Sequence, residues 1–306
     1  MAQKNGEKKS STQNVKAVKE ENPKAAKPAA PAFKIESAKK RKRFGNYLFY
    51  GDYGVGKTTL AASASEVPEM KNVIFINAEA GDESIKHLDI DIVNISNYSQ
   101  FARVHEYLRL HCKYRDAWLN DKDKGAYDKL VQYEATLKGA EVEDVGEPTI
   151  YHTVVIDSLT EVQKYCMYQL LGIQVGEWAL DMAPDSPEWG EWNRSAEMIR
   201  LLVRTFRDLP LHTIFVCGQA SEQDHQKKYH RQPLLPGKLA NEVQGFFDVV
   251  GYMVAGPTEG GEMHRRLWIT PGETYRAKHR FVGFDGKYID HPSMADLAKL
   301  KLAEKK

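Results

Sequence analysis

Residues 46–64, NYLFYGDYGVGKTTLAASA, are the most informative for the fold class of this chain of 306 residues. Residues 46–50 form a short apolar and aromatic run that ends at a glycine, a pattern typical of a buried strand. Residues 58–64 are predicted to form a helix, which Pro68 ends. Between them, residues 51–58 match Gly-x-x-x-x-Gly-Lys-Thr, in which successive backbone N–H groups turn inward around a phosphate. The stretch therefore predicts a P-loop between a strand and a helix.

The P-loop residues have separate predicted roles in binding ATP and Mg²⁺. Lys57 is expected to reach the β- and γ-phosphates, and the Thr58 hydroxyl is expected to bind Mg²⁺, which keeps most of its waters and needs few protein ligands. The flanking strand and helix make a plain glycine turn the weaker interpretation. The predicted nucleotide contacts are Gly51, Asp52, Tyr53, Gly54, Val55, Gly56, Lys57, Thr58 and Thr59.

Two further carboxylates are predicted beside the phosphates. Asp157 follows the buried run 154–156 and is the predicted second metal ligand, although Asp157 or Ser158 could instead cap the next helix. Many P-loop ATPases have a Glu directly after this Asp, but Ser158 stands here. Glu79 follows the strand 73–76 and is the leading candidate for the general base, with a solvated loop charge as the alternative.

The order of elements predicts an α/β fold with a mostly parallel sheet flanked by helices. Helical patterns separate buried runs, as in parallel βαβ units, and the C-terminal pattern changes to antiparallel strand pairs at 249–254 and 265–270. The predicted ATPase domain covers residues 44–290 and contains a charged helical insertion at about 114–149. A short C-terminal helix or tail is predicted for residues 291–306. The predicted buried runs lie at residues 46–50, 73–76, 92–95, 153–156 and 213–216.

The charge is distributed unevenly along the chain. Residues 1–43 hold thirteen Lys or Arg and four Glu, a net charge of +9, so the remainder carries −8. This segment has too few large apolar side chains to fold and is predicted to be a disordered basic tail. It could hold nucleic acid or serve only as a solubilising arm. The absence of a long apolar run, of a signal-peptide pattern and of metal-type cysteine spacing favours a cytoplasmic protein without a membrane partner.

A combination of motifs resembles a known family. The P-loop, Glu79, Asp157-Ser158 and Gln219 after a later strand look like the RecA-type ATPase core. More narrowly, the chain resembles the phage RecA-like, AAA-type ATP-binding proteins of the single-strand annealing and recombination group over about residues 44–290. The motifs that carry the narrower resemblance are Asp157-Ser158-Leu159-Thr160, Trp189-Gly190, Pro236-Gly237-Lys238 with Phe247-Asp248-Val249-Val250, and Ala277-Lys278-His279-Arg280.

The resemblance implies partners and further site residues. It implies that Gln219 senses the γ-phosphate, where the alternative is an ordinary polar strand end. It also implies a homo-oligomer, a ring or a filament, with ATP at subunit interfaces, in which Lys278 and Arg280 reach the γ-phosphate of a neighbouring subunit. A solvated basic strand face is the alternative for these two cations. A single-strand-binding protein is a further partner that the resemblance admits.

Single-stranded DNA is the expected partner of the segment 224–233, which is basic and contains an aromatic residue. Lys227, Lys228 and Arg231 are predicted to contact phosphates, and Tyr229 is predicted to stack on a base. In the resembled family the equivalent loop binds DNA, whereas the residues alone also fit a mobile surface loop. The acidic surroundings of Trp178, Trp189 and Trp192 favour packing over base stacking for these tryptophans.

These patterns predict a Mg²⁺-dependent, DNA-stimulated ATPase that acts on single strands in phage-type recombination or annealing. Two other classes of protein remain open. A P-loop small-molecule kinase would need an arginine-rich lid, and no such segment is seen. A non-catalytic nucleotide switch would act as a scaffold through the charged insertion and the tail.

Overall fold

The computed structural model describes Ser37 and residues 44–173, 186–223, 227–282 and 284–303. The chain divides into two units, residues 1–42 and 43–306, and the description below concerns the second unit. Apart from Ser37, the predicted basic tail of residues 1–43 lies outside the described residues. Residues 174–185 and 224–226 lie outside them as well.

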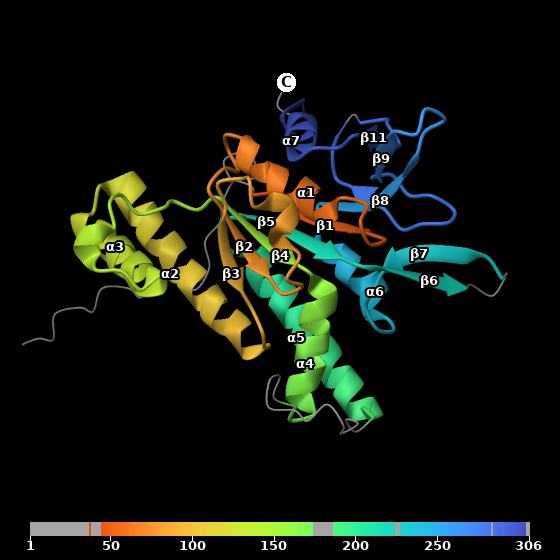
Figure 1. Cartoon of the computed structure of the whole chain (residues 1–306). Coiled ribbons are helices and arrows are strands. Elements are labelled where there is room, and N and C mark those ends of the chain that lie inside the picture. The colour runs from red at the N-terminus through yellow and green to blue at the C-terminus, as the bar shows by residue number, and fades with distance from the viewer. Residues whose placement is uncertain (1–36, 38–43, 174–185, 224–226, 283, 304–306) are drawn as a thin grey trace, which may run out of the picture. The chain divides into compact units, whose positions relative to one another are not determined.

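Within the described residues, a sheet of nine strands forms the centre of the domain (Figure 1). Its order is β11-β9-β8-β1-β5-β4-β2-β3, and β10 also pairs with β8. The neighbours from β3 to β8 pair in parallel, whereas β9, β10 and β11 pair antiparallel. The predicted α/β class, with antiparallel strands toward the C-terminus, is therefore confirmed. The strands are β1 Asn46–Gly51, β2 Val73–Asn77, β3 Asp91–Asn94, β4 Thr153–Asp157, β5 His212–Cys217, β8 Val249–Pro257, β9 Met263–Trp268, β10 Lys278–His279 and β11 Tyr288–Asp290.

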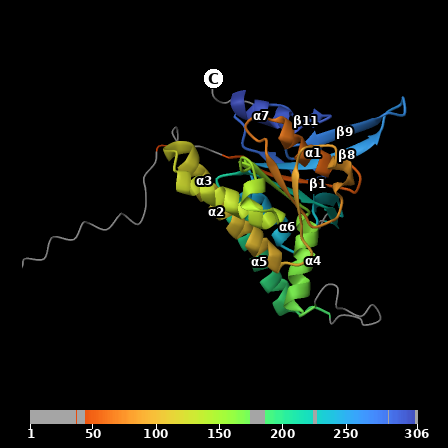
Figure 2. The ribbon, with the colours of Figure 1, turned by 60° about the vertical axis from the view of Figure 1, so that its left-hand side comes forward.

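Helices cover both faces of the sheet, and side chains alternate between the two layers. Tyr47 and Phe49 of β1 pack on the face that carries α1 and α7, whereas Leu48 and Tyr50 pack on the face that carries α2, α4, α5 and α6. Figure 2 shows α1 and α7 on the opposite side of the sheet from α4 and α5. Because both faces are covered, β2 and β4 are buried along their whole length, and β1 and β5 are buried after their first residue. The helices are α1 Lys57–Ala62, α2 Ser99–Asp121, α3 Lys124–Lys138, α4 Leu159–Leu170, α5 Trp189–Arg207, α6 Leu239–Glu242 and α7 Met294–Ala303.

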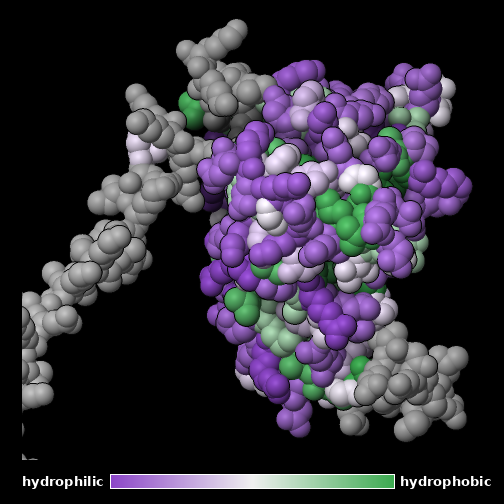
Figure 3. All heavy atoms as spheres, turned by 90° about the vertical axis from the view of Figure 1, so that its left-hand side faces the viewer, coloured by the Kyte–Doolittle hydropathy of each residue, from purple (hydrophilic) through white to green (hydrophobic). Residues whose placement is uncertain are grey.

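The predicted helical insertion has a different boundary in the structure. Helix α2 continues without a break through residue 114, where the insertion was expected to begin, and pairs with α3 as a helical hairpin. Asp123 caps α3, and Gly139 ends it with a φ of 62°. Apolar and aromatic side chains of α2 continue beyond residue 114 because they pack against α3, as Trp118 does against Tyr127. The surface on this side is mostly hydrophilic, with small separate hydrophobic patches (Figure 3).

Buried Arg115 joins this hairpin to the sheet. Its guanidinium donates to the carbonyl oxygens of Tyr151 and Pro210, each at 3.1 Å, and it pairs with Asp116. These carbonyls precede β4 and β5, so one α2 side chain satisfies backbone groups at the amino ends of two strands.

The C-terminal helix packs on the sheet domain. Met294 and Leu297 of α7 are fully buried, and the Met294 N–H donates to Ser63 Oγ at 2.9 Å. Ser63 lies in the 3₁₀ turn Ser63–Glu66 that follows α1. Helix α7 thus belongs to the same hydrophobic core as the helix of the P-loop.

The predicted packing of the tryptophans is wrong for two of them. Trp189 is 80% exposed and Trp192 is 38% exposed at the start of α5, whereas Trp178 lies outside the described residues. The first turn of α5 begins beyond the sheet, where the layers do not bury it, so acidic neighbours were a poor guide to burial.

Candidate nucleotide-binding site

The P-loop leaves β1 at Gly51 and enters α1 at Lys57. Gly54 and Gly56 have φ angles of 71° and 100°, in the left-handed region that favours glycine. At Gly51, an added Cβ would lie 2.3 Å from the carbonyl oxygen of Met253 on β8, so the neighbouring backbone requires glycine there too. Steric limits therefore explain the glycine at each of these three positions of the P-loop.

Lys57 is at the centre of the site. Its Nζ donates to the Asp52 carbonyl oxygen at 2.7 Å and lies 6.0 Å from the centre of the Tyr53 ring. Burial lowers the pKa of the lysine, and the carboxylates of Asp157 and Glu79 oppose this effect. Both predicted carboxylates therefore lie close enough to act on the ammonium group.

Thr58 and Asp157 are in direct contact. Thr58 Oγ1 donates to Asp157 Oδ2 at 2.6 Å. The pKa of Asp157 is raised to about 6, chiefly by burial and also by the nearby charge of Glu79, although the hydrogen bond from Thr58 and the charge of Lys57 act to lower it. The capping role that was the alternative for Asp157 is taken by Ser158, whose Oγ accepts from the Glu161 N–H at 3.4 Å.

Glu79 lies at the same edge of the sheet as Asp157. Strands β2 and β4 are parallel and in register, with Asn77 opposite Asp157, and the Ala78 N–H donates to the Asp157 carbonyl at 2.7 Å. Glu79 is exposed and follows directly. The carboxyl ends of parallel strands meet at one edge, which brings this side chain toward the P-loop.

Gln219 follows β5, the strand that lies between β1 and β4. Cys217 pairs with Tyr50, so Gln219 lies two residues beyond the level of Tyr50, the residue that directly precedes the P-loop. Its Oε1 is buried and has no hydrogen-bond partner among the described residues. The Gly218 N–H donates to the Thr160 hydroxyl at 3.0 Å, which joins this strand end to α4.

The model of the AAA domain family matches residues 44–281, the part of the chain that contains the sheet and all of these side chains. The chain belongs to the AAA domain family. It is therefore a P-loop nucleotide-binding protein.

Solved structures show weaker likenesses to this AAA domain. The flagellar accessory protein FlaH from Methanocaldococcus jannaschii is 10% identical, with a TM-score of 0.37 over 81% of this chain and 84% of that chain. The RadB recombinase is 15% identical, with a TM-score of 0.37 over 80% of this chain and 84% of that chain. No curated protein sequence matches the chain. At these values, neither likeness bears on the function of this AAA domain.

The residues of this AAA domain fit a nucleotide with Mg²⁺. The glycine loop leaves space for phosphates, Lys57 is held beside them, and Thr58 and Asp157 are the oxygen donors that a hard cation prefers. The unpartnered Gln219 Oε1 is a polar atom that a ligand or its water could satisfy. In the described part of the chain, no helix combines the length and apolar character needed to cross a bilayer.

The predicted DNA contacts lie on a hairpin, where a loop was expected. Strands β6 Gln219–Gln223 and β7 Tyr229–Pro233 pair antiparallel. Lys227 and Lys228 are exposed near the turn, and Tyr229 is 57% exposed. Arg231 lies nearer the sheet, where its guanidinium contacts Ser221 and its carbonyl oxygen accepts from the Tyr50 hydroxyl at 3.0 Å. The polar composition concealed the hairpin, because its strands lack the alternation of apolar and polar residues that marks a half-buried strand.

Lys278 and Arg280 lie away from the P-loop of their own chain. Lys278 pairs with Val250, which is level with Leu48 in the first half of β1. From Leu48, strand β1 continues for three residues, about 10 Å, before the P-loop begins at Gly51. Arg280 is engaged by Asp248 at 3.0 Å and by the Gly245 carbonyl at 3.2 Å.

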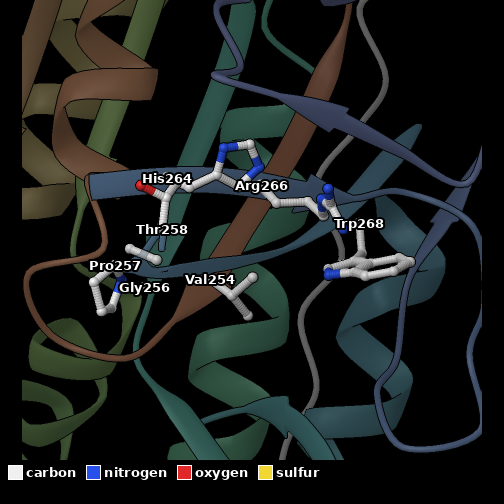
Figure 4. A pocket seen from close by; sticks show the side chains of 8 residues that line it. Val254, Gly256, Pro257, Thr258, His264, Arg266 and Trp268 are labelled. Atoms are coloured by element: carbon white, nitrogen blue, oxygen red, sulfur yellow. The ribbon is translucent and has the colours of Figure 1, made fainter. Parts of the chain in front are cut away.

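A shallow groove of about 550 Å³ lies on β8 and β9 (Figure 4). The predicted site residues do not line it. His264, Arg266 and Trp268 of β9 stand on one face of the strand along this groove. Arg265, which sequence reasoning missed, alternates to the other face and lies beside Gly56 of the P-loop. Its sequence position, in a strand far along the chain, carries no signal of this contact.

Proposed function

We propose that this AAA domain is a Mg²⁺-dependent ATPase that acts on single-stranded DNA in phage-type recombination or annealing. The observation that carries the proposal is the hydrogen bond between Thr58 and Asp157, with Lys57 and Glu79 around the same point. A metal-binding pair, a phosphate-binding lysine and a nearby free carboxylate are what hydrolysis of a phosphoanhydride requires.

Each side chain has a defined task in this proposal. The P-loop amides and Lys57 bind the phosphates, and Thr58 and Asp157 hold Mg²⁺, which would neutralise charge on the phosphate oxygens. Glu79 accepts a proton from the attacking water. Its side chain is exposed, so water can reach the carboxylate.

The DNA part of the proposal rests on the connection between Gln219 and the hairpin. Gln219 is the first residue of β6, and the exposed Tyr229 begins β7 at the other end of the same ribbon. A change at Gln219 on contact with a phosphate can therefore be transmitted to residues 227–229 through one hydrogen-bonded ladder. We propose that this end of the ribbon binds a single strand through the side chains of Lys227, Lys228, Tyr229 and, nearer the sheet, Arg231.

The proposal extends to assembly. Lys278 and Arg280 lie too far along the sheet to serve their own P-loop, so a role at the γ-phosphate requires a second copy. We propose a homo-oligomer, a ring or a filament, with ATP at the interface between subunits. Hydrolysis would then depend on assembly.

An ATPase assay with and without single-stranded DNA, at two salt concentrations, tests this function. We expect Mg²⁺-dependent release of phosphate, stimulation by single strands, and weaker stimulation at high salt because phosphate contacts release counterions. Lys57→Ala is the inactive control. Phosphate transfer to a metabolite would indicate a kinase instead, and slow hydrolysis that ignores DNA would indicate a nucleotide switch.

A further inference from the structure

Arg265 lies against the P-loop although it belongs to a distant strand. An ideal Cβ built on Gly56 would be 3.0 Å from Arg265 Nε and 3.2 Å from Arg265 Cδ. Gly56 is the N-cap of α1 and directly precedes Lys57. The absence of a side chain at Gly56 is therefore what lets this arginine lie alongside the phosphate-binding turn.

The alternation of β9 explains why Arg265, and not Arg266, points this way. His264, Arg266 and Trp268 share the face that lines the groove (Figure 4). Arg265 pairs with Ala255 of β8 and projects to the opposite face, on which α1 packs. Arg265 and Arg266, which are neighbours in β9, therefore lie on opposite faces of the sheet.

The two arginines also differ in their partners. Arg266 is held by Asp290, with Nε–Oδ1 at 2.7 Å and Nη2–Oδ2 at 3.3 Å. Within the described residues, the exposed Arg265 guanidinium makes no hydrogen bond and no ion pair. A guanidinium without an acid partner, placed beside an anion-binding turn, has its donors available for a ligand.

We propose that Arg265 contacts the phosphates of the nucleotide bound by its own P-loop. This inference rests on the proposed nucleotide-binding function and adds a second cation to Lys57. The planar guanidinium can donate two hydrogen bonds to one phosphate group, which an ammonium cannot do with the same geometry. Because Arg265 belongs to the same chain as the loop, this contact needs no neighbouring subunit, in contrast to Lys278 and Arg280.

Binding measurements on the full chain test the inference without hydrolysis. Mg²⁺–ADP and Mg²⁺–pyrophosphate are titrated into the wild type, Arg265→Ala, Arg265→Lys and the matched control Arg266→Ala. We expect Arg265→Ala to weaken both ligands about tenfold, the size expected for one charge-assisted hydrogen bond, and Arg265→Lys to recover part of this loss. Arg266→Ala should remain within about twofold of the wild type, because its side chain faces the groove.

The outcomes separate this inference from the proposed function. If the wild type binds neither ligand, the proposed function and the inference both fail. If the wild type binds and Arg265→Ala binds equally well, only the inference is overturned. Weaker ADP binding with unchanged pyrophosphate binding also overturns it, because the arginine would then contact the nucleoside. Circular dichroism melting of each variant verifies that exposed Arg265 is not needed for folding.

Discussion

Thr58 Oγ1 donates a hydrogen bond of 2.6 Å to Asp157 Oδ2, across 99 residues of sequence. The contact joins the first turn of α1, the helix that follows β1, to the end of β4, and β5 lies between β1 and β4 in the sheet. Both groups are metal ligands by chemistry, and the carboxyl is buried. Without a cation, the site therefore holds a carboxylate that the fold disfavours in its charged form.

Asp157→Asn is expected to stabilise the ligand-free protein while it weakens binding of Mg²⁺–nucleotide. The pKa of Asp157 in the folded protein, about 6, lies above the ordinary value of 3.8. The protonated carboxyl therefore stabilises the fold fully below pH 3.8, and this stabilisation is lost as the pH rises through 6. Ionisation at pH 8 therefore costs up to about 3 kcal/mol, which the amide avoids. Thermal melting at pH 8 measures the gain, with the exposed Asp89→Asn as the control. A lower melting temperature for Asp157→Asn would contradict the prediction.

Glu79→Gln is expected to bind ATP normally and to hydrolyse it about 10²–10⁴-fold more slowly, the usual contribution of a general base. The amide keeps the size of the side chain but cannot accept the proton. Nucleotide affinity and single-turnover hydrolysis are measured on the same preparation. The exposed neighbour Glu83→Gln serves as the control, and normal turnover in Glu79→Gln would remove this residue from the mechanism.

Gln219→Ala is expected to separate ATP hydrolysis from DNA binding. The loss of its amide removes the polar atom at the start of β6 but leaves the P-loop intact, so basal hydrolysis should persist while stimulation by single strands falls several-fold. ATPase rates are compared across a titration of single-stranded DNA. Glu222→Ala, exposed on the same strand, is the control. Equal stimulation of Gln219→Ala and the wild type by single-stranded DNA would show that Gln219 does not couple DNA binding to ATP hydrolysis.

Acid is expected to destabilise the α2 region through His111. Burial lowers the pKa of this histidine to about 4, with Arg115 contributing, and its Nε2 accepts from the Tyr151 N–H at 3.2 Å. The neutral His111 ring contributes fully to the free energy of unfolding above pH 6.5. This contribution, up to about 3 kcal/mol, is lost as the pH falls toward 4.

Asp157 titrates over nearly the same pH range with the opposite sign, so the His111 effect is measured in the Asp157→Asn background. Urea unfolding between pH 7.5 and pH 4.5 should show falling stability there. His111→Gln should flatten the dependence on pH, whatever its effect on absolute stability. An unchanged slope in His111→Gln would assign the acid sensitivity to another group.

Several elements could be predicted because local chemistry decides them. The buried runs at β1, β2, β4 and β5 consist mainly of apolar residues, and the glycines at 51, 54 and 56 are required by backbone geometry at those positions. The insertion expected at about 114–149 shares helix α2 with the residues before it, because a solvent-exposed helix tolerates charged residues and these do not mark its end. The β6–β7 hairpin was missed because its ladder is polar on both faces.

The P-loop, the α/β class and the residue types that can bind phosphate and metal are predictable from local sequence, because each depends on short-range pattern and backbone sterics. Which of these groups come into contact depends on the folded chain. The contact of Thr58 with Asp157 and that of Gly56 with Arg265 depend on strand order and register, which hydrogen bonds between distant segments set. No local preference of either partner encodes such a pairing.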